Sequence, residues 1–218
     1  MLIQDLITAE FAPVTLQSSV QDALDIVDGF KISHIPVFEG LTFIGNMSDL
    51  NLKERPLEET LSDNKMNVEK FFLNENNTIF DAVRIFYRNE SNLIPVLDDH
   101  DKYLGYITAD EIMGELSRMP FLSELSAMIT VKVPTKQFSM SEVAKIVESN
   151  NGRILGCFIS GFSDDMTEIT VRFNAESLSS VVATFERFGY LIKYQFFNDD
   201  KADLLQDRFK QLIKFIDV

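Results

Sequence analysis

Two stretches in the first half of the chain carry apolar residues at helical spacing. In each stretch the apolar positions recur every three or four residues behind a hydroxyl residue suited to cap a helix, Ser19 or Thr78. The two apolar sets are Val20, Ala23, Leu24 and Val27, and Ile79, Ala82, Val83 and Phe86. Each stretch therefore predicts a helix with one buried face.

A short apolar run containing a proline follows each predicted helix. His34-Ile35-Pro36-Val37-Phe38 is matched by Leu93-Ile94-Pro95-Val96-Leu97, so the two prolines are 59 residues apart. A glycine turn also repeats, as Phe43-Ile44-Gly45-Asn46-Met47-Ser48 and Tyr103-Leu104-Gly105-Tyr106-Ile107-Thr108. Three anchors in one order predict an internal repeat, each copy ordered helix, strand, strand, helix. The two strands of each copy are expected to form a hairpin, with the proline at the first position of its strand.

The rest of the chain predicts a connector, a closing helix and a second domain. Residues 55–70 are polar and suit a connector, and Thr108 to Glu111 match a capping box that opens a helix. After about residue 125 the pattern follows the βαββαβ order of ferredoxin-like folds, with strands expected at 127–133, 154–160, 169–173 and 190–196. We predict an α+β protein with repeats at about 1–56 and 57–124, a ferredoxin-like domain at 125–198 and a C-terminal amphipathic helix at 199–218.

Charge and cysteine usage narrow the classes of function. The chain has a net charge of −14, of which −13 falls in residues 1–125, and this acidity argues against contacts with nucleic-acid phosphates. The single cysteine, Cys157, excludes an intramolecular disulfide and multi-cysteine metal sites, and its apolar run predicts a core thiol. No apolar run approaches the ~18 residues of a membrane span. We expect a soluble, cytoplasmic protein with no nucleic-acid or membrane partner.

Candidate catalytic and metal-binding groups are few. His34 is the first residue of the proline run. It either faces a cleft or, as we favour, makes a hydrogen bond with a structural role. His100 lies among three aspartates, Asp98, Asp99 and Asp101, but a hairpin tip of this kind is usually solvated charge. No spacing marks a pair of carboxylates as acid and base. We therefore expect no catalytic residue, no metal site and no required cofactor.

The proline runs, the glycine turns and the helix, strand, strand, helix order resemble a tandem pair of CBS domains, the Bateman module. The resemblance covers roughly the first 120 residues. The second region resembles ACT domains, and the whole layout is similar to acetoin-utilisation accessory proteins. ACT domains that bind amino acids usually carry a glycine before the first helix, whereas residues 134–139 contain none. A packing or dimerising role is therefore expected for this ACT-like domain.

The CBS resemblance implies a nucleotide in the cleft between the repeats. Backbone beside the proline would meet adenine, the hydroxyl of the glycine turn would meet phosphate, and an acid or amide three positions later would hold the ribose. The corresponding residues are Ile35, Pro36, Ser48 and Asn51 in the first repeat and Ile94, Pro95, Thr108 and Glu111 in the second. The alternative for Ser48, Thr108 and Glu111 is helix capping alone.

Two functions stay open at this point. The first is a non-catalytic regulatory protein whose CBS pair senses AMP, ADP, ATP or S-adenosylmethionine, with the ACT-like domain relaying the change or dimerising. The second is a ligand-free, self-associating adaptor. A homodimer is expected, because CBS pairs tend to associate through their helices and the stripe from Leu204 to Ile216 adds apolar surface. The acidic charge predicts a ligand with few phosphates, or one accompanied by Mg²⁺, unless Lys53 and Arg55 form a local cluster.

Overall fold

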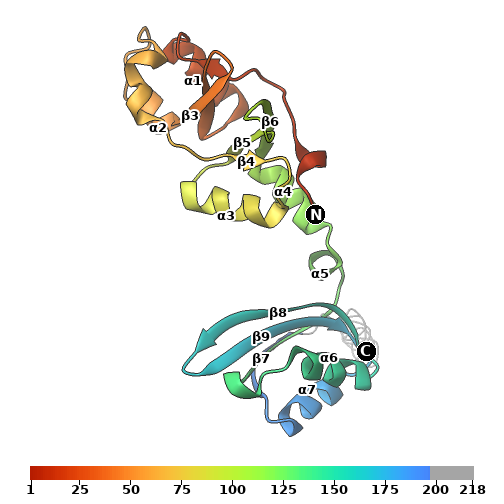
Figure 1. The fold of residues 1–218 in the computed structure, drawn as a ribbon. Helices are drawn as coiled ribbons and strands as arrows, with labels where there is room; N and C mark the ends of the chain where they lie inside the picture. Colours follow the sequence, from red (N-terminus) through yellow and green to blue (C-terminus); the bar gives the residue numbers. More distant parts are fainter. Residues whose placement is uncertain (197–218) are drawn as a thin grey trace, which may run out of the picture. The chain divides into compact units, whose positions relative to one another are not determined.

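The computed structural model describes residues 1–196, except the side chains of residues 64–66. The chain divides into two compact units, Met1–Ser117 and Arg118–Val218 (Figure 1). The predicted amphipathic helix at 199–218, with its stripe from Leu204 to Ile216, lies outside the described residues. Among the residues that are described, no helix is long and apolar enough to cross a membrane.

The first unit contains two copies of the predicted helix, strand, strand, helix order. Each copy also has a two-residue strand before its first helix, which is too short to produce a periodic pattern in the sequence. The first copy comprises β1 (Val14–Thr15), α1 (Val20–Phe30), β2 (His34–Glu39), β3 (Thr42–Ser48) and α2 (Asp49–Lys53). The second comprises β4 (Leu73–Asn74), α3 (Ile79–Asn89), β5 (Leu93–Leu97), β6 (Tyr103–Thr108) and α4 (Ala109–Ser117). Each copy forms a three-stranded sheet with the proline strand in the middle, and both predicted hairpins are confirmed.

Capping boxes fix the starts of α1 and α3, at the cap residues Ser19 and Thr78 that the sequence predicts. The Ser19 hydroxyl accepts a hydrogen bond from the Asp22 N–H, and the Asp22 carboxylate accepts one from the Ser19 N–H. Thr78 and Asp81 repeat the arrangement at α3. These reciprocal bonds satisfy N–H groups that a helix start otherwise leaves unpaired.

The proline lies third in each middle strand, so the prediction that it begins the strand is wrong. Pro36 pairs in register with Asn46, and Pro95 pairs with Tyr106. The backbone of Asn46 bonds outward to Glu69, in both directions. On its other side β2 meets β1 only from Val37 onward. Neither neighbour therefore requires an N–H at the proline position.

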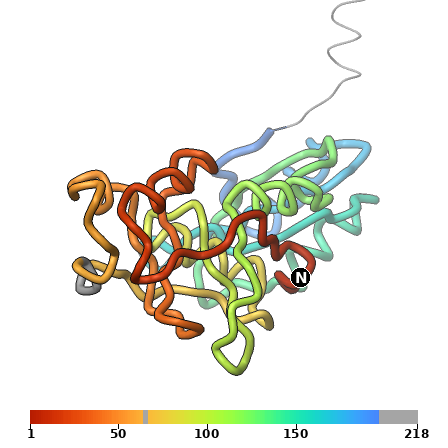
Figure 2. The backbone as a smooth tube through the Cα atoms, turned by 90° about the horizontal axis from the view of Figure 1, so that it is seen from above, coloured from red at the N-terminus to blue at the C-terminus, as the bar shows by residue number. Residues whose placement is uncertain are grey.

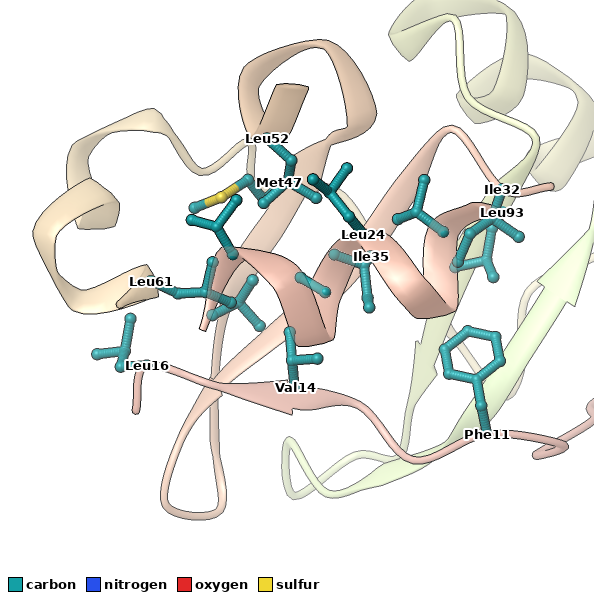
Figure 3. Close-up of a cluster of buried hydrophobic side chains, with 14 of the residues drawn as sticks. Phe11, Val14, Leu16, Leu24, Ile32, Ile35, Met47, Leu52, Leu61 and Leu93 are labelled. Atoms are coloured by element: carbon teal, nitrogen blue, oxygen red, sulfur yellow. The ribbon is translucent and has the colours of Figure 1, made fainter. Parts of the chain in front are cut away.

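The core of the first repeat lies between the inner face of α1 and the hairpin of β2 and β3 (Figure 3). Leu24, Ile35 and Met47 are buried there, and Leu93 and Tyr106 of the second repeat belong to the same cluster. The core of the first repeat therefore includes two side chains of the second repeat.

The second unit is an antiparallel sheet with two helices on one face (Figure 1). Its elements are α5 (Pro120–Ser123), β7 (Ala127–Pro134), α6 (Met140–Ser149), β8 (Arg153–Ser163), β9 (Met166–Asn174), α7 (Leu178–Arg187) and β10 (Leu191–Phe196). The strand order β10-β7-β9-β8 follows from the predicted βαββαβ sequence of elements. Phe121 of α5 packs edge-on against Phe158 and lies over Gly156, where a side chain would collide with its ring.

Candidate functional site

A local twofold relates the two repeats and passes between Ser33 and Asn92. These residues are 59 positions apart, the same interval as the two prolines, and they bond directly to each other. The Ser33 N–H donates to Asn92 Oδ1 at 2.8 Å, and the Asn92 N–H donates to Ser33 Oγ at 2.9 Å. The starts of β2 and β5 therefore meet at this point.

Each repeat is bonded to a segment that lies just before the other repeat in the sequence. The N-terminal segment, red in Figures 1 and 2, bonds to the second repeat, where Thr8 and Tyr106 exchange both backbone hydrogen bonds at 2.9 and 2.8 Å. Glu69, in the connector, does the same with Asn46 of the first repeat. Each crossing segment lies beside a β-strand that leads to a predicted phosphate-binding hydroxyl, Thr108 or Ser48.

A cavity of ≈ 200 Å³ lies between the repeats beside two of the predicted residues, Thr108 and Glu111. Strand β6 contributes Tyr106, and α4 begins just behind Thr108. The remaining walls come from the first half of the unit: Thr8, Glu10, Phe30 and Ile32. Two carboxylates and no cationic side chain therefore line this cavity.

Thr108 and Glu111 form the predicted capping box. Glu111 Oε2 accepts from the Thr108 N–H at 2.7 Å and from its hydroxyl at 3.0 Å, while the Glu111 N–H donates to Thr108 Oγ1 at 3.3 Å. Both of these bonds to the carboxylate use Oε2, which leaves the second carboxylate oxygen, Oε1, outside the capping box. The capping role and a ribose-binding role are therefore compatible in this geometry.

Tyr106 forms an aromatic wall of the cavity. Its ring stacks on Phe11 with 4.5 Å between centroids, and Phe11 also contacts Phe30 at 4.8 Å. Burial raises the pKa of the Tyr106 hydroxyl, and the Glu10 carboxylate raises it further. The Tyr106 hydroxyl is therefore uncharged at neutral pH, and a hydrogen bond with the Glu10 backbone also engages it.

The corresponding region of the first repeat is more enclosed. Ser48 is buried, and its hydroxyl caps α2 by accepting from the Asn51 N–H at 3.3 Å. Asn46 corresponds to Tyr106 and Ser91 to Ile32; among the described residues Asn46 Oδ1 and Ser91 Oγ are buried without a hydrogen-bond partner. Buried polar atoms of this kind usually bind a water or a ligand group.

The four remaining predicted residues are part of the core. Ile35 and Ile94 are fully buried, and Pro36 and Pro95 are buried beside them. Because these four side chains are buried, only the backbone of these residues is suited to contact a ligand.

One cationic side chain near the local twofold, Lys53, is paired with carboxylates. Lys53 Nζ lies 3.0 Å from Asp49 and 3.9 Å from Asp28, and these three residues line a second cavity of ≈ 270 Å³ with Ser33 and Asn92. The ammonium charge of Lys53 is therefore offset on both sides, while Lys31 also lines this cavity.

Other candidate groups have structural surroundings. Burial raises the pKa of the Cys157 thiol to about 11, and its sulfur lies 3.1 Å from Met140 Sδ. His34 is buried with Nδ1 bonded to Ser33 Oγ at 2.9 Å, and burial lowers its pKa against the opposing effect of Glu69. The structural reading of both residues agrees with the sequence prediction. Within residues 1–196 no group of three His, Cys, Asp or Glu side chains is arranged to hold a metal ion.

Sequence reasoning missed five residues of the ≈ 200 Å³ cavity. Tyr106 was open to prediction, because it is two positions before Thr108 and alternate strand residues share a face. The other four, Thr8, Glu10, Phe30 and Ile32, depend on a long-range pairing that leaves no periodic pattern.

The comparisons with known proteins agree with a CBS assignment. Residues 65–118 match the family model described as "CBS domain", so the chain contains a CBS domain at its second repeat. No curated protein matches the chain.

The similar solved structures include proteins with CBS domains. A CBS domain pair/ACT domain protein from Thermotoga maritima is 19% identical, covers 53% of this chain and 96% of its own, and has a TM-score of 0.48. The CBS domains of a transcriptional regulator from Streptococcus pneumoniae are 19% identical, with coverages of 52% and 98% and a TM-score of 0.47. CBSX2 in complex with AMP is 21% identical, with coverages of 53% and 95% and a TM-score of 0.44.

Proposed function

We propose that this chain is a non-catalytic regulatory protein whose first unit binds an adenosine-containing ligand between its repeats. The ligand would occupy the cavity beside Thr108 and Glu111, with its ribose hydroxyls on Glu111 Oε1 and its base near Phe30 and Tyr106. The second unit, ACT-like in its βαββαβ order, would relay the change or form the contact of a homodimer.

One observation carries this proposal: the cavity beside the capping box of α4 is built from both repeats. A ligand there would contact the N-terminal segment, the end of α1 and the start of α4 together. Binding would therefore change how the two repeats pack against each other. Regulation by a ligand requires two such arrangements that differ in their affinity for it. The CBS match over residues 65–118 supports the same region.

The charges around the cavity favour a ligand with few phosphates. Glu10 and Glu111 line it, and Lys53 is already offset by Asp28 and Asp49. A triphosphate would bring about four negative charges into this field, and each unit pair at ~4 Å costs roughly 4 kcal/mol at an effective dielectric constant of 20. We therefore propose that AMP or adenosine binds more tightly than ATP unless Mg²⁺ accompanies the triphosphate.

The alternative is a ligand-free adaptor that uses both units only for self-association. It is favoured by the size of the cavity, ≈ 200 Å³, against the roughly 300–1,000 Å³ of ordinary ligand sites. It is also favoured by the capping bonds that already use Ser48, Thr108 and Glu111.

Calorimetry and thermal unfolding separate the two functions. The full chain would be titrated with AMP, ADP, ATP and S-adenosylmethionine, each with and without Mg²⁺. A ligand at 100 times its Kd stabilises the protein by about 2.7 kcal/mol. Absence of heat and of a thermal shift with all four would support the adaptor.

A matched pair of variants assigns the binding to the cavity. Glu111→Ala and Asp81→Ala each remove the acid of a Thr-based capping box, at the starts of α4 and α3. Both are expected to lose about 1 kcal/mol of stability. Only Glu111→Ala should weaken AMP binding, and equal affinities in the two variants would place the ligand elsewhere.

A further inference from the structure

A cavity of ≈ 650 Å³ lies at the opposite end of the hairpins from the local twofold. Its walls come from the end of β2 with the adjoining turn and from the turn that leads into β6, together with two residues around β1. The chain travels roughly 20 Å along β2 between Ser33, at the twofold, and Gly40, at this cavity. The cavity is therefore separate from the proposed nucleotide site.

The volume and the walls suit a small organic ligand. A volume of ≈ 650 Å³ falls within the roughly 300–1,000 Å³ typical of ligand sites. Phe38 and Tyr103 line it, and their rings meet edge-on at 5.2 Å between centroids. Aromatic rings offer apolar contact and a negative face that attracts cations.

Leu41 places an exposed apolar side chain at the edge of the cavity, and the geometry of the turn does not require a leucine there. The turn joins Glu39 to Thr42, and Gly40 supplies the positive φ of 62° that such a tight turn needs. Leu41 follows it with 93% of its surface exposed, although polar residues are usual at a turn. An exposed leucine at the mouth of an aromatic cavity gains stabilisation when a ligand covers it.

Asp101 and Lys102 both line the cavity, and the neighbouring carboxylates of Asp98 and Asp99 make the net charge of this turn negative. Asp98 accepts hydrogen bonds from the N–H groups of His100 and Lys102, and both side chains also help to lower the pKa of its carboxyl. Asp101 has a left-handed backbone (φ 60°) at the hairpin tip and lines both this cavity and a smaller one of ≈ 150 Å³. Residues 1–117 carry 21 acidic and 8 basic side chains, so the surrounding field also attracts cations.

We propose that the cavity between the hairpin tips binds a small organic cation, an amine or quaternary ammonium with an apolar body. The apolar body would lie against Phe38, Tyr103 and Leu41, and the charge would lie at Asp101. Lys102 also lines the cavity but is exposed, so its flexible side chain is able to leave the mouth when a cation enters.

Benzyltrimethylammonium is a suitable probe, and phenylacetate is its anionic counterpart of similar size. Titration of the full chain followed by NMR should give saturable shifts at residues 38–41 and 100–103 with benzyltrimethylammonium. Phenylacetate should bind at least tenfold more weakly. Equal binding of the two probes, or saturating shifts at other residues, would overturn the proposal. The absence of any binding of benzyltrimethylammonium at about 10 mM would overturn it as well.

Asp101→Asn tests the role of the carboxylate, because asparagine tolerates the left-handed backbone. The expected loss of affinity for benzyltrimethylammonium is at least fivefold. Glu58→Gln changes the net charge by the same amount at an exposed site in the connector and should leave the affinity unchanged. Equal losses in both variants would indicate a general charge effect and would contradict a specific site.

Discussion

Substitution of Gly105 by alanine should destabilise the first unit through its contact with the N-terminal segment. Gly105 has a φ of +146°, a conformation that L side chains rarely adopt. An added Cβ would lie 2.3 Å from the Thr8 carbonyl oxygen and 2.8 Å from Ile7 Cγ2. Because Thr8 is bonded to Tyr106 in both directions, the segment is unable to move away without losing those bonds.

The magnitude follows from these contacts. Two hydrogen bonds contribute about 1 kcal/mol each, and a strained backbone costs about 1–3 kcal/mol. The expected loss is therefore about 3–5 kcal/mol. Gly45→Ala, at the matching position within β3, should cost less because its Cβ would lie 3.0 Å from the Glu69 oxygen. Gly29→Ala, in α1 with nothing within 4 Å of the added Cβ, should stabilise by about 0.5–1 kcal/mol.

Hydrogen exchange read by mass spectrometry is the appropriate assay, because peptides from residues 1–117 report the first unit separately from the second. In Gly105→Ala the peptides spanning Thr8 and Tyr106 should exchange faster, and peptides of the sheet in the second unit should not change. The reasoning is refuted if Gly105→Ala costs no more than Gly45→Ala, or if exchange at Thr8 is unaltered.

Three further predictions concern single contacts. A double-mutant cycle with Ser33→Ala and Asn92→Ala should give about 1 kcal/mol of coupling in urea unfolding, and additive losses would mean that the bonds across the local twofold contribute nothing. Burial lowers the pKa of His34 in the folded chain, so the unfolded chain binds more protons. The free energy of unfolding should therefore fall as the pH decreases from about 7 through the ordinary His pKa. His34→Leu should flatten this part of the pH profile. Tyr190→Phe should cost the second unit about 1 kcal/mol, because the hydroxyl donates to Glu142 at 2.9 Å, and an unchanged denaturation midpoint would contradict that.

Local chemistry explains why most of the fold was predictable. Capping hydroxyls at Ser19, Thr78 and Thr108 and the spacing of apolar residues depend only on neighbours within one or two turns of helix. The strand order of the second unit follows from the same kind of pattern. The proline position was misjudged because its tolerance depends on where Asn46 directs its backbone bonds, which is a property of the third strand.

Only two of the seven residues that line the candidate cavity were predicted, for a related reason. Thr108 and Glu111 belong to a local capping motif that the sequence shows, and the resemblance to CBS domains implied their place in a ligand site. Thr8 and Glu10 reach the site because the N-terminal segment pairs with β6, almost 100 residues later in the chain. Such a pairing depends on the packed arrangement of both repeats, and no local periodicity encodes it.

The local twofold also shows how the two halves have diverged at matching positions. Beside β6 the site presents Tyr106, Ile32 and Glu10, whereas the matching positions beside β3 hold Asn46, Ser91 and Phe71. Asn46 Nδ2 donates to the Phe71 carbonyl oxygen at 2.7 Å, which ties the crossing segment to β3. The aromatic, acidic cavity beside β6 thus corresponds to a region beside β3 where, among the described residues, Asn46 Oδ1 and Ser91 Oγ are buried without a hydrogen-bond partner. Because the two sets of groups differ in charge and in hydrogen-bonding capacity, the same molecule would not bind both with equal affinity, and a regulatory ligand would act on the two repeats unequally.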